Sequence, residues 1–227
     1  MCIRDRVREA VSLAGFRGSQ QRIVTPMDTR GLTAVLEISN TDSVPARVNV
    51  SASAKTGQNV LDQSINLAPF STQHVILDGA LAGDLGLAIV NGGAGDKVMV
   101  TGMQYGRNAR AGVSNIYPIP ARQAIGSIMQ GTYNTFLGQD CSLLLGNLAP
   151  GAESISYDVT RFDGTVLTRG RRGSVPGEGV LEIDLCSQDV DNVYGVVRVN
   201  ATSNNAIVGN VVRSGVGDNY RLATPAR

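Results

Sequence analysis

The stretch LGLAIVNGGAGDKVMVTGMQY, residues 85–105, decides the fold because its pattern returns at residues 194–213 as YGVVRVNATSNNAIVGNVVR. Both copies read as a β-strand, a turn that begins with Asn, and a second β-strand. Asn91 of the first copy corresponds to Asn200 of the second, 109 positions further along. Three upstream turn residues repeat at an offset of 107: Asn40, Gly57 and Pro69 correspond to Asn147, Gly164 and Pro176. The sequence therefore predicts two copies of one domain.

The segments between the turns have the alternating pattern of β-strands. In Arg47–Ala54 the apolar residues Val48, Val50 and Ala52 share one face, and polar residues occupy the other. About seven such strands fit in each copy, with turn residues roughly every 8 to 12 positions. Helices are nearly absent, with Ala121–Gln130 as the best candidate. We predict an all-β fold of two tandem antiparallel β-sandwich domains with immunoglobulin-like topology.

The domain boundaries follow from the repeat. We expect a leading segment over residues 1–18, a first sandwich over 19–120 and a second over 121–227. Tyr117–Arg122, YPIPAR, contains two prolines and is interpreted as a short, stiff linker. Met1–Arg6, MCIRDR, resembles a translated sequencing-adapter fragment from environmental DNA, so we interpret it as an artefact.

Composition excludes several classes of partner. The chain has 227 residues, a net charge of +1 with both signs scattered, and 42% hydrophobic residues. Such a charge balance gives no electrostatic footprint for nucleic acid. No apolar run approaches the roughly 18 residues of a membrane helix, so we expect no membrane insertion by this sequence. Protein partners, or copies of the chain itself, are the expected partners.

The sequence offers little for catalysis or metal binding. His74 is the single histidine, and it lies on the polar face of the strand expected over Gln73–Leu77. No motif for a nucleophile elbow or a phosphate loop is present. Asp189–Asn192 begins like a calcium loop but lacks the downstream Gly and Glu. We therefore expect no enzyme activity, no catalytic residue, no cofactor and no metal site.

A glycan site is the reasonable binding hypothesis for a β-sandwich, although aromatic residues make up only 4% of the chain and Trp is absent. Arg169, Arg171 and Arg172 are the densest basic group and could hold an anionic glycan. Glu178 and Glu182 follow closely and could neutralise these arginines across a hairpin. A charged edge strand that blocks unwanted pairing explains the arginines equally well.

Leu87 and Ile89 form an unusual second apolar face on the strand that begins the repeated stretch. Their counterparts in the second copy are Val196 and Arg198, and an unpaired Arg is rarely buried. The face of Leu87 and Ile89 should therefore point outward. We expect these two residues at an interface with the other domain, a neighbouring chain or a further repeat.

Cys141 and Cys186 are predicted to form a disulfide. The corresponding positions of the first copy at the offset of 107 are Ala34 and Gly79, so both cysteines are present in one copy and absent from the other. Two strands of a sandwich can bring such residues within the Cα separation that a disulfide requires. The alternative is two buried free thiols that act as small apolar fillers. A disulfide would favour an oxidising compartment.

Two motifs of the first copy carry a family resemblance. The alternating run Val48–Ser51, and Leu67–Thr72 after the Gly57 turn, resemble bacterial Ig-like cell-surface modules, including CARDB-type adhesion-related domains. The resemblance implies a non-enzymatic structural or spacer repeat of an extracellular bacterial surface, filament or adhesin protein. The alternative function is a ligand-binding module that recognises a glycan or a protein.

Overall fold

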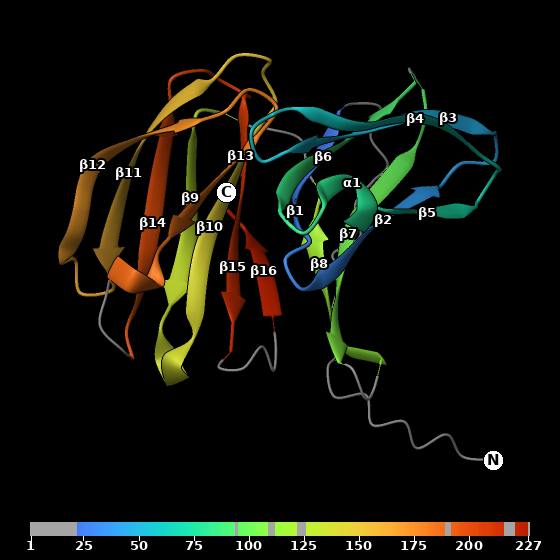
Figure 1. The fold of residues 1–227 in the computed structure, drawn as a ribbon. Coiled ribbons are helices and arrows are strands. Elements are labelled where there is room, and N and C mark those ends of the chain that lie inside the picture. The colour runs from blue at the N-terminus through green and yellow to red at the C-terminus, as the bar shows by residue number, and fades with distance from the viewer. Residues whose placement is uncertain are drawn as a thin grey trace.

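The computed structural model describes residues 22–93, 95–108, 112–121, 126–188, 192–215 and 221–226. Within these residues, sixteen strands form four antiparallel four-stranded sheets, arranged as two sandwiches that lie side by side (Figure 1). The predicted all-β class with two β-sandwich domains is confirmed. The leading segment over residues 1–18, including Met1–Arg6, lies outside the described residues.

The first sandwich consists of two sheets with the strand orders β1-β6-β3-β4 and β5-β2-β7-β8. Its strands are β1 (Ile23–Asp28), β2 (Leu32–Asn40), β3 (Ala46–Ala54), β4 (Asn59–Leu67), β5 (Thr72–Ile76), β6 (Leu85–Gly92), β7 (Val98–Asn108) and β8 (Gly112–Pro120). One helical turn, α1 (Asp78–Leu81), connects β5 to β6.

The second sandwich repeats this plan with the strand orders β9-β14-β11-β12 and β13-β10-β15-β16. Its strands are β9 (Ile128–Asn134), β10 (Asp140–Asn147), β11 (Glu153–Arg161), β12 (Val166–Val175), β13 (Val180–Asp184), β14 (Tyr194–Ala201), β15 (Ile207–Ser214) and β16 (Arg221–Pro225). The 3-10 turns are η1 (Phe136–Gly138) and η2 (Cys186–Gln188).

Corresponding strands occupy the same place in both sandwiches, but the order differs from the immunoglobulin arrangement. In immunoglobulin domains the sixth and seventh strands lie in one sheet. Here β6 and β7 belong to opposite sheets, because the connection between them crosses from one layer to the other and places β7 beside β2. The repeat is therefore of a sandwich with its own strand order.

The alternating residues fill two separate cores. Val48, Val50 and Ala52 of β3 are buried in the first core, as their spacing predicts. The corresponding strand β11 contributes Ile155 and Tyr157 to the second core. Each core thus depends on the period-2 pattern that the sequence displays.

Asn40 and Asn147 show how closely the two domains correspond. Each is the last residue of its strand, and each side chain is buried. Asn40 donates from Nδ2 to the carbonyl oxygens of Val44 (2.7 Å) and Ala68 (3.1 Å). Asn147 donates to Gly151 (2.8 Å) and Val175 (3.2 Å). Because each buried amide donates to two loop carbonyls, it fixes the loop that follows the strand.

The expected match of Pro69 with Pro176 is wrong by one residue. Tyr157 pairs with Arg171 and Val159 pairs with Thr168, so β12 carries one residue more than β4 at this point. The extra residue forms a β-bulge at Gly170, which has a φ of 57°. Beyond this bulge the offset becomes 108.

The residues at the domain junction also differ from the prediction. Tyr117–Pro120 is part of β8, where Tyr117 pairs with Gln104, and is not a linker. Its prolines are tolerated because β8 is an edge strand. Ala121–Gln130, the best helix candidate of the sequence, is not helical from Ile128 onward, where β9 begins.

Candidate functional site

The interface between the two sandwiches is the most developed site of the described residues. Leu87 and Ile89 of β6 point away from their own core and are almost completely buried. They pack with Val24 of β1 against Val180 and Val208 of the second domain. The structure therefore places the Leu87–Ile89 face between the two domains, which is one of the three locations expected from the sequence.

A second apolar cluster continues this interface toward β8 and β16, which lie next to each other in Figure 1. Leu85, Tyr117 and Ile119 of the first domain pack against the second domain. Their partners are Leu144, Val212 and Ala223. Tyr117 and Ile119, which belong to the segment expected to be a linker, thus contribute contact surface to the interface.

Two arginines of the first domain bind carboxylates of the second at the rim. Arg22 donates to the carbonyl oxygen of Leu148 and to Oε1 of Glu178, both at 2.7 Å. Arg30 donates to both carboxylate oxygens of Glu182 at 2.9 Å. Hydrogen bonds to Asp28 and then to Glu182 raise the pKa of Arg30 above its usual range. Because these groups are partly exposed, each pair contributes about 0–1 kcal/mol and mainly fixes the register of the two domains.

These ion pairs correct one interpretation of the sequence. Glu178 and Glu182 bind arginines of the other domain and do not neutralise the Arg169–Arg172 group. The reason is that β13 and the turn before it lie at the domain interface. Arg171 and Arg172 instead line a pocket of about 330 Å³ together with Tyr157, Glu182, Asp184 and Ser187.

The main chains of the two domains also touch. Val180 donates its backbone N–H to the carbonyl oxygen of Lys55 at 3.0 Å. Gly57, in the turn after β3, has a φ of 92°, and a Cβ at this position would collide with the carbonyl oxygen of Gly177. The matching turn residue Gly164 has a φ of 87° but has no atom within 4 Å of a corresponding Cβ. Gly57 is therefore required by both the turn and the interface.

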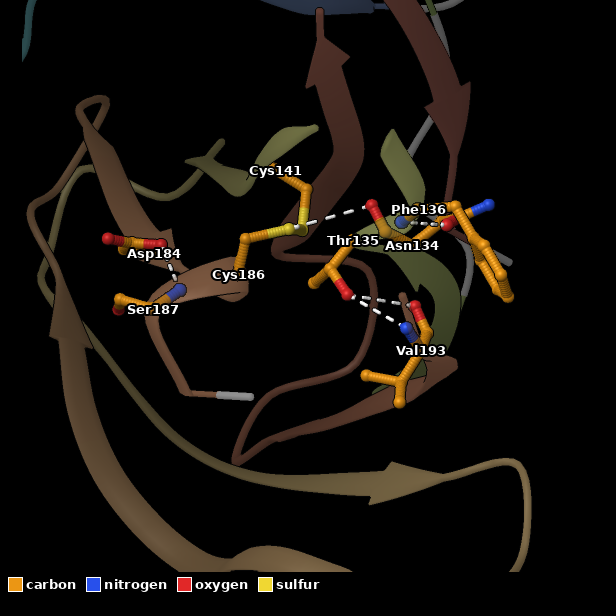
Figure 2. The surroundings of a disulfide bond; sticks show 8 residues. All are labelled: Asn134, Thr135, Phe136, Cys141, Asp184, Cys186, Ser187 and Val193. Carbon is orange, nitrogen blue, oxygen red and sulfur yellow. Dashed lines mark hydrogen bonds between the residues drawn. A yellow bond between two sulfur atoms is a disulfide. The ribbon is translucent and has the colours of Figure 1, made fainter. Parts of the chain in front are cut away.

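The predicted disulfide between Cys141 and Cys186 is confirmed (Figure 2). The two Cα atoms are 5.1 Å apart, and the bond closes a sequence separation of 45 residues. β10 and β13 run side by side, and Leu185 donates its N–H to the carbonyl oxygen of Cys141 at 3.0 Å. The disulfide therefore extends this strand pair beyond its last ladder bond.

The first domain uses a hydrogen bond where the second has the disulfide. Leu77 donates to the carbonyl oxygen of Ala34 at 2.9 Å, as Leu185 does to Cys141, so the residue that corresponds to Cys186 is Asp78, not Gly79. Oδ1 of Asp78 accepts the backbone N–H of Ala34 at 2.7 Å. The second copy thus has a disulfide, and the first a hydrogen bond from a backbone amide to a carboxylate, at the same end of the corresponding strand pair.

An exposed aromatic cluster on the second domain was missed by the sequence analysis. The rings of Phe162 and Tyr194 stack with centroids 4.8 Å apart, and Phe136 lies 6.2 Å from Tyr194. These residues are far apart in sequence, so no local motif marks them. The one signal for this cluster is the offset of 109, which places Tyr194 at the position of the interface residue Leu85.

His74 and the acidic side chains are the residues that the sequence offers for catalysis or metal binding. His74 is exposed, and its Nε2 lies 3.4 Å from Oε1 of Glu37. In the described part of the chain, no group of three or more His, Cys, Asp or Glu side chains is placed to hold a metal ion. Asp189 and Asp191 lie outside that part. No helix among the described segments is long and apolar enough to cross a membrane.

Comparisons with known proteins show no family. No family model matches the sequence, and no curated protein matches it. An anti-sigma factor domain-containing protein is similar over 93% of this chain and 88% of its own, with 9% identity and a TM-score of 0.25. A β-glucuronidase of Bacteroides uniformis is similar over 92% of this chain and 26% of its own, with 11% identity and a TM-score of 0.20. Likenesses this weak carry no argument about function.

Replacing Gly57 and Gly164 separately by Ala should separate turn strain from interface contact. We expect Gly164→Ala to cost about 1–2 kcal/mol, because it forces an L-residue into the left-handed region. Gly57→Ala should cost a further 1–3 kcal/mol or so, because its Cβ must displace the Gly177 carbonyl. Urea unfolding of both variants measures the difference. Equal losses would show that Gly57 has no role in the interface.

Replacing both cysteines by Ala should lower the stability of the second domain. The chain-entropy model for the closed loop gives about 4 kcal/mol. Thiol titration of the denatured, unreduced protein with Cys2→Ser should detect no reactive sulfur. Two reactive sulfurs would contradict the bond. Asp78→Ala is the matched variant of the first domain and should cost only about 1–3 kcal/mol.

Proposed function

We propose that the protein is a non-enzymatic structural module of an extracellular bacterial surface, filament or adhesin protein, in which two sandwiches act as one rigid spacer. The observation that carries this proposal is the continuous interface formed by Leu85, Leu87 and Ile89 with the second domain. A flexible tandem array would need no such apolar surface. The disulfide supports the extracellular part of the proposal, because such bonds persist in oxidising compartments.

The kind of contact also supports a rigid arrangement of the two domains. The apolar clusters exclude water at the centre, while Arg22 and Arg30 bind carboxylates at the rim and oppose sliding of one domain over the other. The backbone hydrogen bond from Val180 to Lys55 is directional, so it restricts the relative orientation of the domains more than apolar packing alone does. Resemblance to CARDB-type surface modules agrees with this role.

A second candidate function is ligand binding, favoured by the pocket that Arg171 and Arg172 line. Glu182 and Asp184 also line this pocket, so its lining includes both hydrogen-bond donors and acceptors for a polar ligand. Saturable binding of an anionic oligosaccharide that Arg172→Ala abolishes would favour this role over a spacer.

Small-angle X-ray scattering tests the spacer. At low concentration, the wild-type curve should fit one fixed arrangement of the two domains. Ile89→Asp should increase the radius of gyration and require an ensemble, because it buries a charge between the domains. Arg198→Asp is the matched control: the position corresponds to Ile89 but is exposed, so the curve should not change. A wild-type curve that itself requires many orientations would refute the rigid spacer.

A further inference from the structure

The second domain carries an exposed counterpart of the face with which the first domain binds it. The pairing registers define the correspondence: β6 pairs with β1 through Val90 and Ile23, and β14 pairs with β9 through Val199 and Met129. Arg22 therefore corresponds to Ile128. By the same registers, Arg30, Leu85, Leu87 and Ile89 correspond to Phe136, Tyr194, Val196 and Arg198. We call these five residues of the second domain the β9/β14 face.

The β9/β14 face is exposed, although all of its residues except Arg198 are apolar or aromatic. Ile128 and Tyr194 are each 49% exposed, and Phe136 and Val196 each 40%. Tyr194 stacks on Phe162, which is also exposed. Concentrations of exposed aromatic and aliphatic side chains are typical of protein interaction surfaces.

The first domain, in turn, carries the counterpart of the face that the second domain presents at the interface within the chain. Glu37 pairs across the sheet with Thr101 and His74, as Leu144 pairs with Asn210 and Glu182. The interface residues Leu144, Glu178, Glu182, Val208 and Val212 therefore correspond to Glu37, Phe70, His74, Met99 and Met103. We call these five residues of the first domain the β2/β7 face. Phe70 is assigned by its loop: it donates to Asp42 as Glu178 donates to Ala149, and both have a φ of 52°.

An ion pair of the interface within the chain has apolar residues at both of its corresponding positions on the β9/β14 and β2/β7 faces. Within the chain, Arg22 of one face binds Glu178 of the other at 2.7 Å. At the corresponding positions stand Ile128 and Phe70, which is 73% exposed. Both members of an ion pair have thus been replaced by large apolar residues, a change that suits a contact between the two faces. The other rim pair, Arg30 and Glu182, corresponds to Phe136 and His74, which can stack.

We propose that the β9/β14 face of one chain binds the β2/β7 face of a second copy, and that this contact repeats the geometry of the interface within the chain. Tyr194 would then lie where Leu85 lies, against Met103 of the neighbouring copy, and Ile128 would meet Phe70. Because each copy presents two different faces, the contact is heterologous and leads to head-to-tail assemblies that can grow beyond a dimer. This inference rests on the proposed structural role and adds its partner.

A second copy fits these faces better than an unrelated partner does. The two faces correspond in position to two faces that bind each other within the chain, and their backbone ladders keep the same registers.

Sedimentation velocity on the full chain over about a hundredfold range of concentration tests the proposal. We expect the wild-type sedimentation coefficient to keep rising past that of a dimer. Phe70→Asp and Tyr194→Asp should each remain monomeric. An equal mixture of the two variants should form a dimer and nothing larger, because each variant retains the face that the other has lost. Ser64→Asp, an exposed position on β4, should assemble like the wild type.

Restoring the ion pair gives a second readout. Phe70→Glu and Ile128→Arg should each weaken assembly, and the double variant should recover it in a form that added salt weakens. A wild-type chain that stays monomeric throughout, or a mixture of the two Asp variants that does not dimerise, would overturn the proposal. Because the scattering experiment uses monomers, either result would leave the rigid spacer intact.

Discussion

The burial of one strand, β6, on both faces is the constraint on which the rest of the structure depends. Ala88 and Val90 belong to the core of the first sandwich, whereas Leu87 and Ile89 belong to the interface. An antiparallel sheet can leave one face in water, and the strand would then alternate apolar with polar residues. Because β6 has no polar face, the first sandwich needs a second surface against it. The second domain supplies that surface, and the two domains are thereby joined into one unit.

The two copies keep a common scaffold and differ where each meets its surroundings. Asn40 and Asn147 satisfy loop carbonyls in the same way, so this interaction belongs to the scaffold. Cys141–Cys186 in one copy and the Asp78–Ala34 hydrogen bond in the other close the same strand pair. The face that the first domain buries against the second differs more from its exposed counterpart, where Ile128 takes the place of Arg22 and Tyr194 that of Leu85. This division agrees with a module whose fold is fixed while its contacts vary.

Period-2 patterns and the internal repeat were enough to predict the class of fold, because burial of one strand face leaves a direct trace in sequence. Val48 and Val50 are examples. The cysteine pair was predictable because both residues are present in one copy only. The strand in Tyr117–Pro120 was not, because its prolines favour a linker when the edge position of β8 is unknown. The partners of Glu178 and Glu182 could not be predicted either, because ion pairs between residues far apart in sequence leave no local pattern.

Differential scanning calorimetry of the intact chain tests the central claim, that the interface makes one unit of two sandwiches, most directly. If the claim holds, the chain unfolds in a single transition whose calorimetric and van't Hoff enthalpies agree. Two transitions of about half the total enthalpy each, unaffected by substitution of Leu87, would show that the sandwiches unfold independently and would contradict it.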